Sequence, residues 1–303
     1  MNPIEAMRAE IEYQAQDLEK QSLPHPRKNC LFVGSGDSFV AGLVAHYISG
    51  GHALCCYPTD IIHNPSVVDG RDVYIVSISG NTKANILAAR TARRRRGGVL
   101  TTAITAKPAS RLAKECHKVI ALKYRSAGIT TAGTISFSSS MLTCASLATK
   151  ISLPRDLGSL YKRAKFQAET IASEIGNGTC FILGDSICYP VAVYGALKFN
   201  EVFGRKAFAY PAEEFCHSPL FSLKKGDTLI VMENKQLDQR LRDDGYSSVH
   251  VDFRGERGIR LLMRSTFFMQ CLVLKLAQRH GLTTCYFLKN KRLLKTSSDF
   301  IYA

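Results

Sequence analysis

Short apolar runs alternate with longer amphipathic stretches along the first half of the chain. Runs rich in β-branched and other apolar residues predict strands at residues 30–33, 53–57, 73–77, 99–105 and 118–122. Helical length and spacing predict helices at residues 3–20, 38–48, 82–94 and 109–115, and an apolar helix at about 136–150. Because the strands are apolar on both faces, they are typical of a parallel sheet covered by helices on both sides.

The second half of the chain repeats this alternation. Residues 153–156 (Leu-Pro-Arg-Asp) mark a boundary, and an amphipathic helix to about residue 175 and a Gly-Asn-Gly turn at 176–178 follow it. Residues 181–186 are weakly similar to residues 32–38, and a helix follows both segments. We therefore expect an α/β protein of two tandem, doubly wound units with mostly parallel sheets, residues 1–153 and 154–303.

Composition narrows the class of protein. Hydrophobic residues make up 46% and charged residues 21% of the 303 positions, as in ordinary globular domains. No run approaches 18 apolar residues and the first ten residues include acids, so we expect a cytoplasmic protein without a membrane partner. The ten cysteines include no CxxC pair, which favours reduced, buried thiols and no metal site.

The net charge of +15 would attract anions of several kinds, from nucleic acids to phosphorylated metabolites. Part of the excess lies in the arginine run at residues 93–96, directly before Gly97 and Gly98. Cations and glycine are both favoured at a helix carboxyl end, which accounts for this run without a partner. The sequence contains no recognisable nucleic-acid module, so we do not expect a nucleic-acid partner.

Two loops between a predicted strand and a predicted helix could hold an anion. Residues 34–38 (Gly-Ser-Gly-Asp-Ser) carry glycines that let backbone amides approach a ligand closely, and residues 77–82 (Ser-Ile-Ser-Gly-Asn-Thr) offer three hydroxyls at a helix amino end. The alternative is that these residues only cap helices and turn the chain. A dinucleotide fingerprint is disfavoured, because Phe39 stands where its third glycine belongs.

The second half offers a candidate acid–base group. Lys198 and Glu201 are three residues apart on a predicted helix and are therefore neighbours, although a routine surface ion pair would look the same. His217 lies between polar and turn-forming residues rather than on an apolar stripe. A lone histidine is also often structural, so both interpretations stay open.

Taken in order, four segments resemble the sugar isomerase (SIS) family, and most of all the isomerase half of glucosamine-6-phosphate synthase. The resemblance rests on residues 35–38 (Ser-Gly-Asp-Ser), 77–82, 194–201 (Tyr-Gly-Ala-Leu-Lys-Phe-Asn-Glu) and 217–219 (His-Ser-Pro). Residues 292–296 also resemble the tail of that family, in which a lysine enters the active site. The resemblance implies two flavodoxin-like SIS subdomains, with the active-site tail in the second.

The resemblance also implies roles for individual residues. It implies that a sugar phosphate is bound by Gly36, Ser38, Ser77, Ser79, Thr82, Thr130, Thr131 and Lys198. Glu201 would move a proton between C1 and C2 of the open-chain sugar. His217 would open the ring from the partner's side of a site shared in a homodimer or larger assembly. Lys295 would form a Schiff base or neutralise charge, and its alternative is a solvated tail lysine.

Two departures from the family pattern bear on the substrate: Tyr194 replaces a glutamate and Ile78 replaces a polar residue. The first cysteine, Cys30, lies in a predicted strand, so we do not expect the glutaminase part that supplies ammonia in the synthase. We therefore expect deamination of glucosamine 6-phosphate to fructose 6-phosphate, without a cofactor. A plain phosphoglucose or phosphomannose isomerase, a fructosamine-phosphate deglycase and a non-catalytic sugar-phosphate sensor remain alternatives.

Overall fold

A computed structural model describes residues 1–95 and 98–302 of the chain. Arg96, the last residue of the arginine run, and Gly97, which follows it, lie outside the described residues. The chain forms two compact units, each with one sheet. The first-sheet unit consists of Lys20–Ser126, Ile135–Ser152 and Lys291–Ala303, and the second-sheet unit consists of Met1–Glu19, Ala127–Thr134 and Leu153–Asn290.

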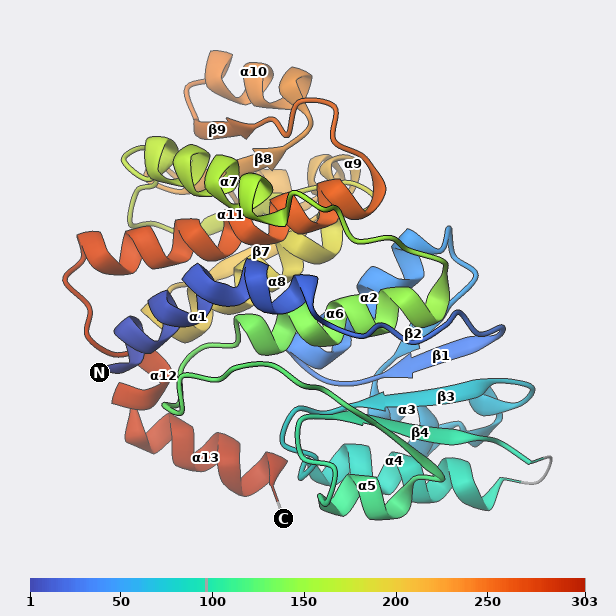
Figure 1. Cartoon of the computed structure of the whole chain (residues 1–303). Helices are drawn as coiled ribbons and strands as arrows, with labels where there is room; N and C mark the ends of the chain where they lie inside the picture. Colours follow the sequence, from blue (N-terminus) through green and yellow to red (C-terminus); the bar gives the residue numbers. More distant parts are fainter. Residues whose placement is uncertain (96–97, 303) are drawn as a thin grey trace. The chain divides into compact units, whose positions relative to one another are not determined.

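In the first-sheet unit, the described strands form a parallel sheet in the order β2-β1-β3-β4-β5 (Figure 1). The strands are β1 (Cys30–Val33), β2 (Leu54–Cys56), β3 (Asp72–Val76), β4 (Thr101–Thr105) and β5 (Lys118–Ala121). This order is that of flavodoxin-like folds. Each strand overlaps the one that the apolar runs predict.

Helices cover both faces of this first sheet (Figure 1). The helices are α2 (Asp37–Ile48), α3 (Pro58–His63), α4 (Lys83–Arg94), α5 (Arg111–Glu115), α6 (Ile135–Ala148) and α13 (Lys291–Ile301), with a 3-10 turn η1 (Pro65–Val68). Helices α2 and α6 pack together on one face, and α3 and α4 pack together on the other. Buried side chains such as Leu31, Val73 and Ile75 pack against Ile61 of α3 and Ile86 of α4, so the core fixes where each loop leaves the sheet.

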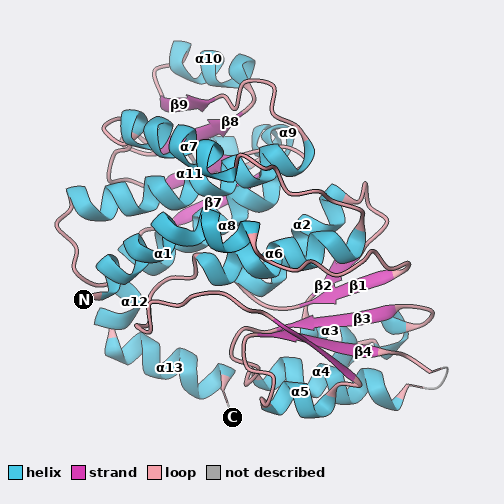
Figure 2. Cartoon of the chain, viewed as in Figure 1, coloured by secondary structure: helices cyan, strands magenta, loops and turns pink. Residues whose placement is uncertain are grey.

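The second-sheet unit contains a parallel sheet in the order β7-β6-β8-β9. Its strands are β6 (Cys180–Leu183), β7 (Ala207–Tyr210), β8 (Thr228–Met232) and β9 (Ser247–Val251). Its helices are α1 (Pro3–Glu19), α7 (Leu157–Ile171), α8 (Cys188–Phe203), α9 (Ala212–His217), α10 (Lys235–Asp243), α11 (Gly258–Arg279) and α12 (Tyr286–Lys289), with a 3-10 turn η2 (Pro219–Ser222). Figure 2 shows the strands β8 and β9 beside α10.

The two parallel sheets flanked by helices confirm the predicted α/β class. The units, however, are not the two contiguous halves that the sequence suggests. Helix α1 belongs to the second-sheet unit, where its buried side chains pack against α7 and α11. Helix α13 belongs to the first-sheet unit, where the Lys83 side chain donates a 3.0 Å hydrogen bond to the Asp299 carbonyl.

Within the described residues, every helix is too short or too polar to cross a bilayer.

Candidate functional site

The predicted phosphate loop lies at the carboxyl end of β3, next to the carboxyl end of β1. Strand β1 lies between β2 and β3, so the chain leaves β1 and β3 toward opposite sides of the sheet. Ligands of such sheets bind in the crevice at this reversal of strand order. The two loops singled out in the sequence, residues 34–38 and 77–82, therefore begin at the same edge.

The hydroxyls of the phosphate loop are held in place by the loop's own backbone. Ser77 is buried, and its Oγ accepts a 3.1 Å hydrogen bond from the Gly80 amide and lies 3.5 Å from Thr82 Oγ1. Ser79 Oγ accepts a 3.3 Å bond from the Asn81 amide. Thr82 directly precedes α4, whose first amides have no partners within the helix. Three hydroxyls beside free amides are chemically suited to a phosphate.

Gly80 makes this tight loop possible. Its φ is +64°, a conformation that residues with a Cβ rarely adopt. A Cβ built there would lie 2.0 Å from Ser110 Oγ, because the Gly80 carbonyl accepts a 2.9 Å bond from the Leu112 amide and holds the loop against α5. The loop is therefore fixed before any ligand binds.

The loop at residues 34–38 also contains a glycine with a positive φ directly before a helix. Gly36 has a φ of +56° and directly precedes α2, and Ser38 lies in the first turn of that helix. A Cβ on Gly34 would lie 2.7 Å from the Ser38 carbonyl carbon. Phe39 follows with its ring stacked 4.1 Å from the Tyr57 ring. The structure thus places Gly36 on the loop after β1 and Ser38 in the first turn of α2.

The chain's tail contacts the phosphate loop within the first-sheet unit. Tyr302 forms an isolated antiparallel bridge with Thr82, and Lys83 binds the Asp299 carbonyl one turn earlier in the tail. Lys295 lies on α13 with its side chain exposed, and its ammonium donates a 2.5 Å bond to Asp299 Oδ2. Lys295 is therefore on the element that touches the loop, paired with a carboxylate of the same helix.

In the second-sheet unit, Lys198 and Glu201 form a close ion pair on α8. The Lys198 ammonium lies 2.5 Å from Glu201 Oε2 and 5.1 Å from the centre of the Tyr194 ring. The Lys198 side chain is 1% exposed, whereas that of Glu201 is 36% exposed. A buried cation thus fixes one oxygen of a carboxylate that remains accessible, which is more than a routine surface pair.

Thr130 and Thr131 lie on the segment 127–134, which several buried groups anchor. The Tyr194 hydroxyl donates a 2.6 Å bond to the Gly133 carbonyl, and Glu10 accepts bonds from the Ala127 amide at 3.0 Å and from Thr134 Oγ1 at 2.5 Å. Tyr194, in place of the family glutamate, therefore connects the helix of Glu201 to the segment of Thr131. Thr130 is exposed.

Cys285 is a neighbour of this group that the sequence did not indicate. Its Sγ lies 3.7 Å from Thr131 Oγ1. Burial raises the pKa of the Cys285 thiol, hydrogen bonds from Ala132 and Thr131 lower it, and the charges of Glu201 and Lys198 act on it in opposite directions. The predominantly neutral thiol therefore lies close to the ion pair. The two are more than 80 residues apart in the sequence, so their spacing does not indicate this proximity.

His217 lies apart on α9, at the last position of that helix. Its side chain is 70% exposed, and its Nε2 lies 3.9 Å from Glu213 Oε1. An exposed imidazole beside a carboxylate can exchange protons with a group that approaches from outside. The described residues contain no cluster of three or more His, Cys, Asp or Glu suited to a metal ion.

A family comparison covers the two loops of the first-sheet unit. Residues 25–150, which include both loops of the first-sheet unit, match the SIS domain family. The chain belongs to the SIS domain family. The match covers most of the first-sheet unit, where the loop at residues 77–82 and the loop at residues 34–38 lie.

The curated relatives of this SIS protein are isomerising aminotransferases. It is 30% identical over 228 residues to a glutamine–fructose-6-phosphate aminotransferase of Pyrobaculum aerophilum, covering 67% of the chain and 37% of the relative. It is 29% identical over 269 residues to the corresponding enzyme of Legionella pneumophila, covering 80% of the chain and 42% of the relative. The chain therefore spans less than half the length of these relatives.

Solved structures show the same fold at low identity. A glucosamine-6-phosphate deaminase of Thermotoga maritima has a TM-score of 0.71 and 22% identity, with 93% of this chain and 94% of that chain covered. A tagatose-6-phosphate ketose/aldose isomerase of Escherichia coli has a TM-score of 0.68 and 18% identity, with 93% and 89% covered. The fold of the whole SIS protein is thus shared with proteins that bear these names.

Proposed function

We propose that this SIS protein is a phosphosugar aldose–ketose isomerase that releases ammonia, converting glucosamine 6-phosphate and water to fructose 6-phosphate and ammonia. The observation that carries the proposal is the pair of Lys198 and Glu201, in which a buried ammonium orients an accessible carboxylate. The hydroxyl loop and the names of the relatives support a sugar phosphate as the substrate.

The proposed reaction needs one group that takes a proton from C2 and returns it to C1. Glu201 would remove the C2 proton of the open-chain amino sugar and deliver it to C1 while the C1 oxygen becomes a hydroxyl. The product is an imine at C2, which water hydrolyses to the ketone and ammonia. Lys198 would hold Glu201 in place through their 2.5 Å contact, and no metal or organic cofactor is required for such an enolisation.

Other residues would bind and prepare the substrate. Ser77, Ser79 and Thr82 would hold the phosphate, with Gly36 and Ser38 beside it. Four more residues complete the proposed site: Thr130, Thr131, His217 and Lys295. The threonines would line the sugar, His217 of a second copy would open the ring, and Lys295 would neutralise charge or form a Schiff base with the ketose. We propose a cytoplasmic homodimer on this basis.

The decisive experiment measures both products. The purified protein is incubated with glucosamine 6-phosphate, and fructose 6-phosphate and ammonia are followed together. The Glu201→Gln variant, which keeps the shape and removes the base, should lower kcat by about 10²–10⁴-fold. The matched control is Glu169→Gln, on an exposed position of α7, which should retain the wild-type kcat.

If the wild type does not release ammonia from glucosamine 6-phosphate, the other measurements distinguish the alternatives. If glucose 6-phosphate and fructose 6-phosphate interconvert while no ammonia is released, the protein is a plain isomerase and the deaminating step is excluded. If neither reaction occurs and the sugar phosphates still bind, the sensor alternative replaces catalysis. Equal activity of Glu201→Gln and Glu169→Gln would remove Glu201 from the mechanism.

A further inference from the structure

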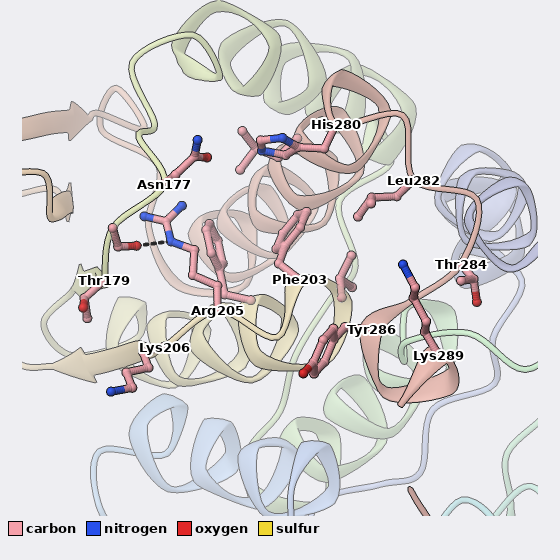
Figure 3. A pocket seen from close by; sticks show the side chains of 14 residues that line it. Asn177, Thr179, Phe203, Arg205, Lys206, His280, Leu282, Thr284, Tyr286 and Lys289 are labelled. Atoms are coloured by element: carbon pink, nitrogen blue, oxygen red, sulfur yellow. Dashed lines mark hydrogen bonds between the residues drawn. The ribbon is translucent and has the colours of Figure 1, made fainter. Parts of the chain in front are cut away.

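The second-sheet unit contains a cavity of about 600 Å³ that lies outside the candidate site. It opens at the amino ends of β6 and β7, between residues 177–179, the loop at residues 205–206, the carboxyl ends of α8 and α11, and α12 (Figure 3). Ligands at the reversal of strand order bind at the opposite, carboxyl ends of parallel strands. None of the residues proposed for catalysis lines the cavity, so its chemistry needs a separate explanation.

The lining combines aromatic rings with cations. Phe199 and Phe203 of α8 and Tyr286 of α12 supply rings, and Arg205, Lys206 and Lys289 supply positive charge; His280 adds a titratable ring (Figure 3). No aspartate or glutamate occurs among the lining residues of the described cavity. The charges of the lining side chains therefore favour an anion, although the charge of Asp227 also acts on Arg205. The rings favour a flat apolar group.

Arg205 is the anchor of this arrangement. Its Nε and Nη1 donate to the carbonyls of Gly178 and Gly176, which fixes the plane of the guanidinium, and its side chain lies over the Phe199 ring at 5.4 Å. Its Nη2 is buried and has no hydrogen-bond partner among the described residues. Burial lowers the pKa of Arg205, which reflects the cost of desolvating the cation. The negative charge of an anion in the cavity would offset that cost through its attraction to the guanidinium.

We infer that this cavity binds a small anionic ligand with an aromatic ring. The acidic group would lie at Arg205, with Lys206 and Lys289 at the rim, and the ring would lie among Phe203, Tyr286 and Leu282. The volume is within the range of about 300–1,000 Å³ of small-molecule sites, large enough for one ring system with one acidic group. The inference does not depend on the proposed isomerase reaction.

A fluorescent pair of dyes tests both parts of the inference. The probe is 1-anilinonaphthalene-8-sulfonate, an aromatic anion, and its counterpart is N-phenyl-1-naphthylamine, which has the same rings without the sulfonate. At low salt, the wild type should bind the anion saturably, with a Kd about tenfold lower than for the neutral dye. Equal Kd values for the two dyes would overturn the inference, because the cations would then have no role.

Variants assign the binding to this cavity. Lys206→Gln/Lys289→Gln changes two exposed side chains at the rim and should raise the Kd of the anionic dye about fivefold. The matched control, Arg155→Gln/Lys162→Gln, removes the same charge from exposed positions outside the cavity and should leave the Kd within about twofold. Equal effects of the two double variants would mean that net charge alone attracts the dye, and would overturn the inference.

Arg205→Met tests the anchor itself. It should abolish the preference for the anionic over the neutral dye while the neutral dye still binds. Circular dichroism reports whether this variant folds, since Arg205 also bonds two backbone carbonyls. If it does not fold, the lysine pair decides the inference, because those two side chains are exposed and make no buried contacts of that kind.

Discussion

Burial of Lys198 distinguishes its ion pair with Glu201 from an ordinary pair on a helix surface. A solvent-exposed pair at this spacing contributes little, because water screens both charges. Here the ammonium is 1% exposed and lies against the Tyr194 ring, so removing its partner would leave a buried cation. One oxygen of the carboxylate is thereby held by the ammonium, while the side chain stays 36% exposed.

Tyr194→Phe should separate the positioning of the sugar segment from catalysis. The substitution removes the hydroxyl that binds the Gly133 carbonyl and keeps the ring against Lys198. The free energy of unfolding should fall by about 1–2 kcal/mol, since the carbonyl loses a buried partner. KM for the sugar phosphate should rise more than kcat falls. Denaturant titration and steady-state kinetics measure the two effects.

The control for this variant is Tyr246→Phe. Tyr246 has an exposed side chain, so losing its hydroxyl should leave both stability and KM unchanged. If Tyr194→Phe loses kcat with an unchanged KM, the hydroxyl takes part in the reaction itself and the positioning role is wrong.

Sequence spacing could predict the ion pair but not its surroundings. Three residues on one helix are neighbours whatever the fold, so the proximity of Lys198 to Glu201 followed from the helix alone. Cys285 and Glu10 come from distant parts of the chain. They reach this region because α1 packs against α11, and because α12, which Cys285 directly precedes, packs against α8. Local patterns carry no information about such long-range contacts.

At the scale of elements, the phosphate loop depends on Gly80 for its shape. Gly80→Ala should lower the free energy of unfolding by about 2–4 kcal/mol, because it combines a positive φ with a Cβ that would lie 2.0 Å from Ser110 Oγ. Gly70→Ala is the matched control: its φ is +70° and a Cβ there would meet open space, so only about 1 kcal/mol should be lost. Denaturant midpoints measure both.

If the two glycine variants lose the same stability, the crowding against Ser110 is relieved by small shifts and the loop is less rigid than its contacts indicate. If Gly80→Ala folds but no longer binds the sugar phosphate, the loop's shape matters for binding as well. Isothermal titration with the sugar phosphate distinguishes these cases.

Two salt bridges join Glu256, on the loop before α11, to α7 and α11, and they should make the stability of the protein fall at acid pH. Glu256 accepts a 2.7 Å bond from Arg260 of α11 and a 2.9 Å bond from Arg163 of α7. The bond from Arg260 holds the pKa of Glu256 below its ordinary 4.5, although burial opposes this. A lowered folded pKa contributes stability above the unfolded pKa, and that stability is lost as pH falls through the folded value.

Glu256→Gln should therefore destabilise the protein by about 1 kcal/mol at pH 7, and the difference from the wild type should shrink below about pH 4. Urea titrations at pH 7, 5 and 3.5 measure the difference. The exposed Glu169→Gln should show no such trend. If the difference in unfolding free energy stays constant from pH 7 to 3.5, the glutamine side chain destabilises the protein for steric reasons and not because the negative charge is lost.

The order of the main elements was predictable, whereas several short elements were not. Apolar runs of strand length fixed β1 and β3 to within one residue of the structure, since their side chains are buried on both faces. Helix α3 is six residues long, and tertiary packing of Ile61 stabilises it rather than any periodic pattern. Helix α13 has no buried residues, so its sequence offered only a resemblance to a family tail.

At the scale of the whole molecule, the two units are each assembled from separate parts of the chain. The segment 127–134 is covalently part of the first half, but Glu10 and Tyr194 bond it into the second-sheet unit. A single boundary judged from composition divides the chain into two contiguous halves, so it cannot predict a unit that is assembled from several separate segments. The hydroxyls of residues 77–82 belong to the first-sheet unit, and the ion pair of α8 belongs to the second-sheet unit.

The proposed sharing of His217 between two copies leads to a test on the whole assembly. In a symmetric dimer, each site would combine Glu201 of one chain with His217 of the other. Glu201→Gln and His217→Asn should each be nearly inactive alone. After the two variants exchange subunits in equal amounts, half of the dimers would be mixed, and each mixed dimer would hold one site with both residues intact, so about a quarter of wild-type activity should return. Native mass spectrometry verifies that exchange has occurred. Full exchange without recovered activity would place both residues within a single chain's site. A His217→Asn variant that is active alone would remove His217 from the reaction.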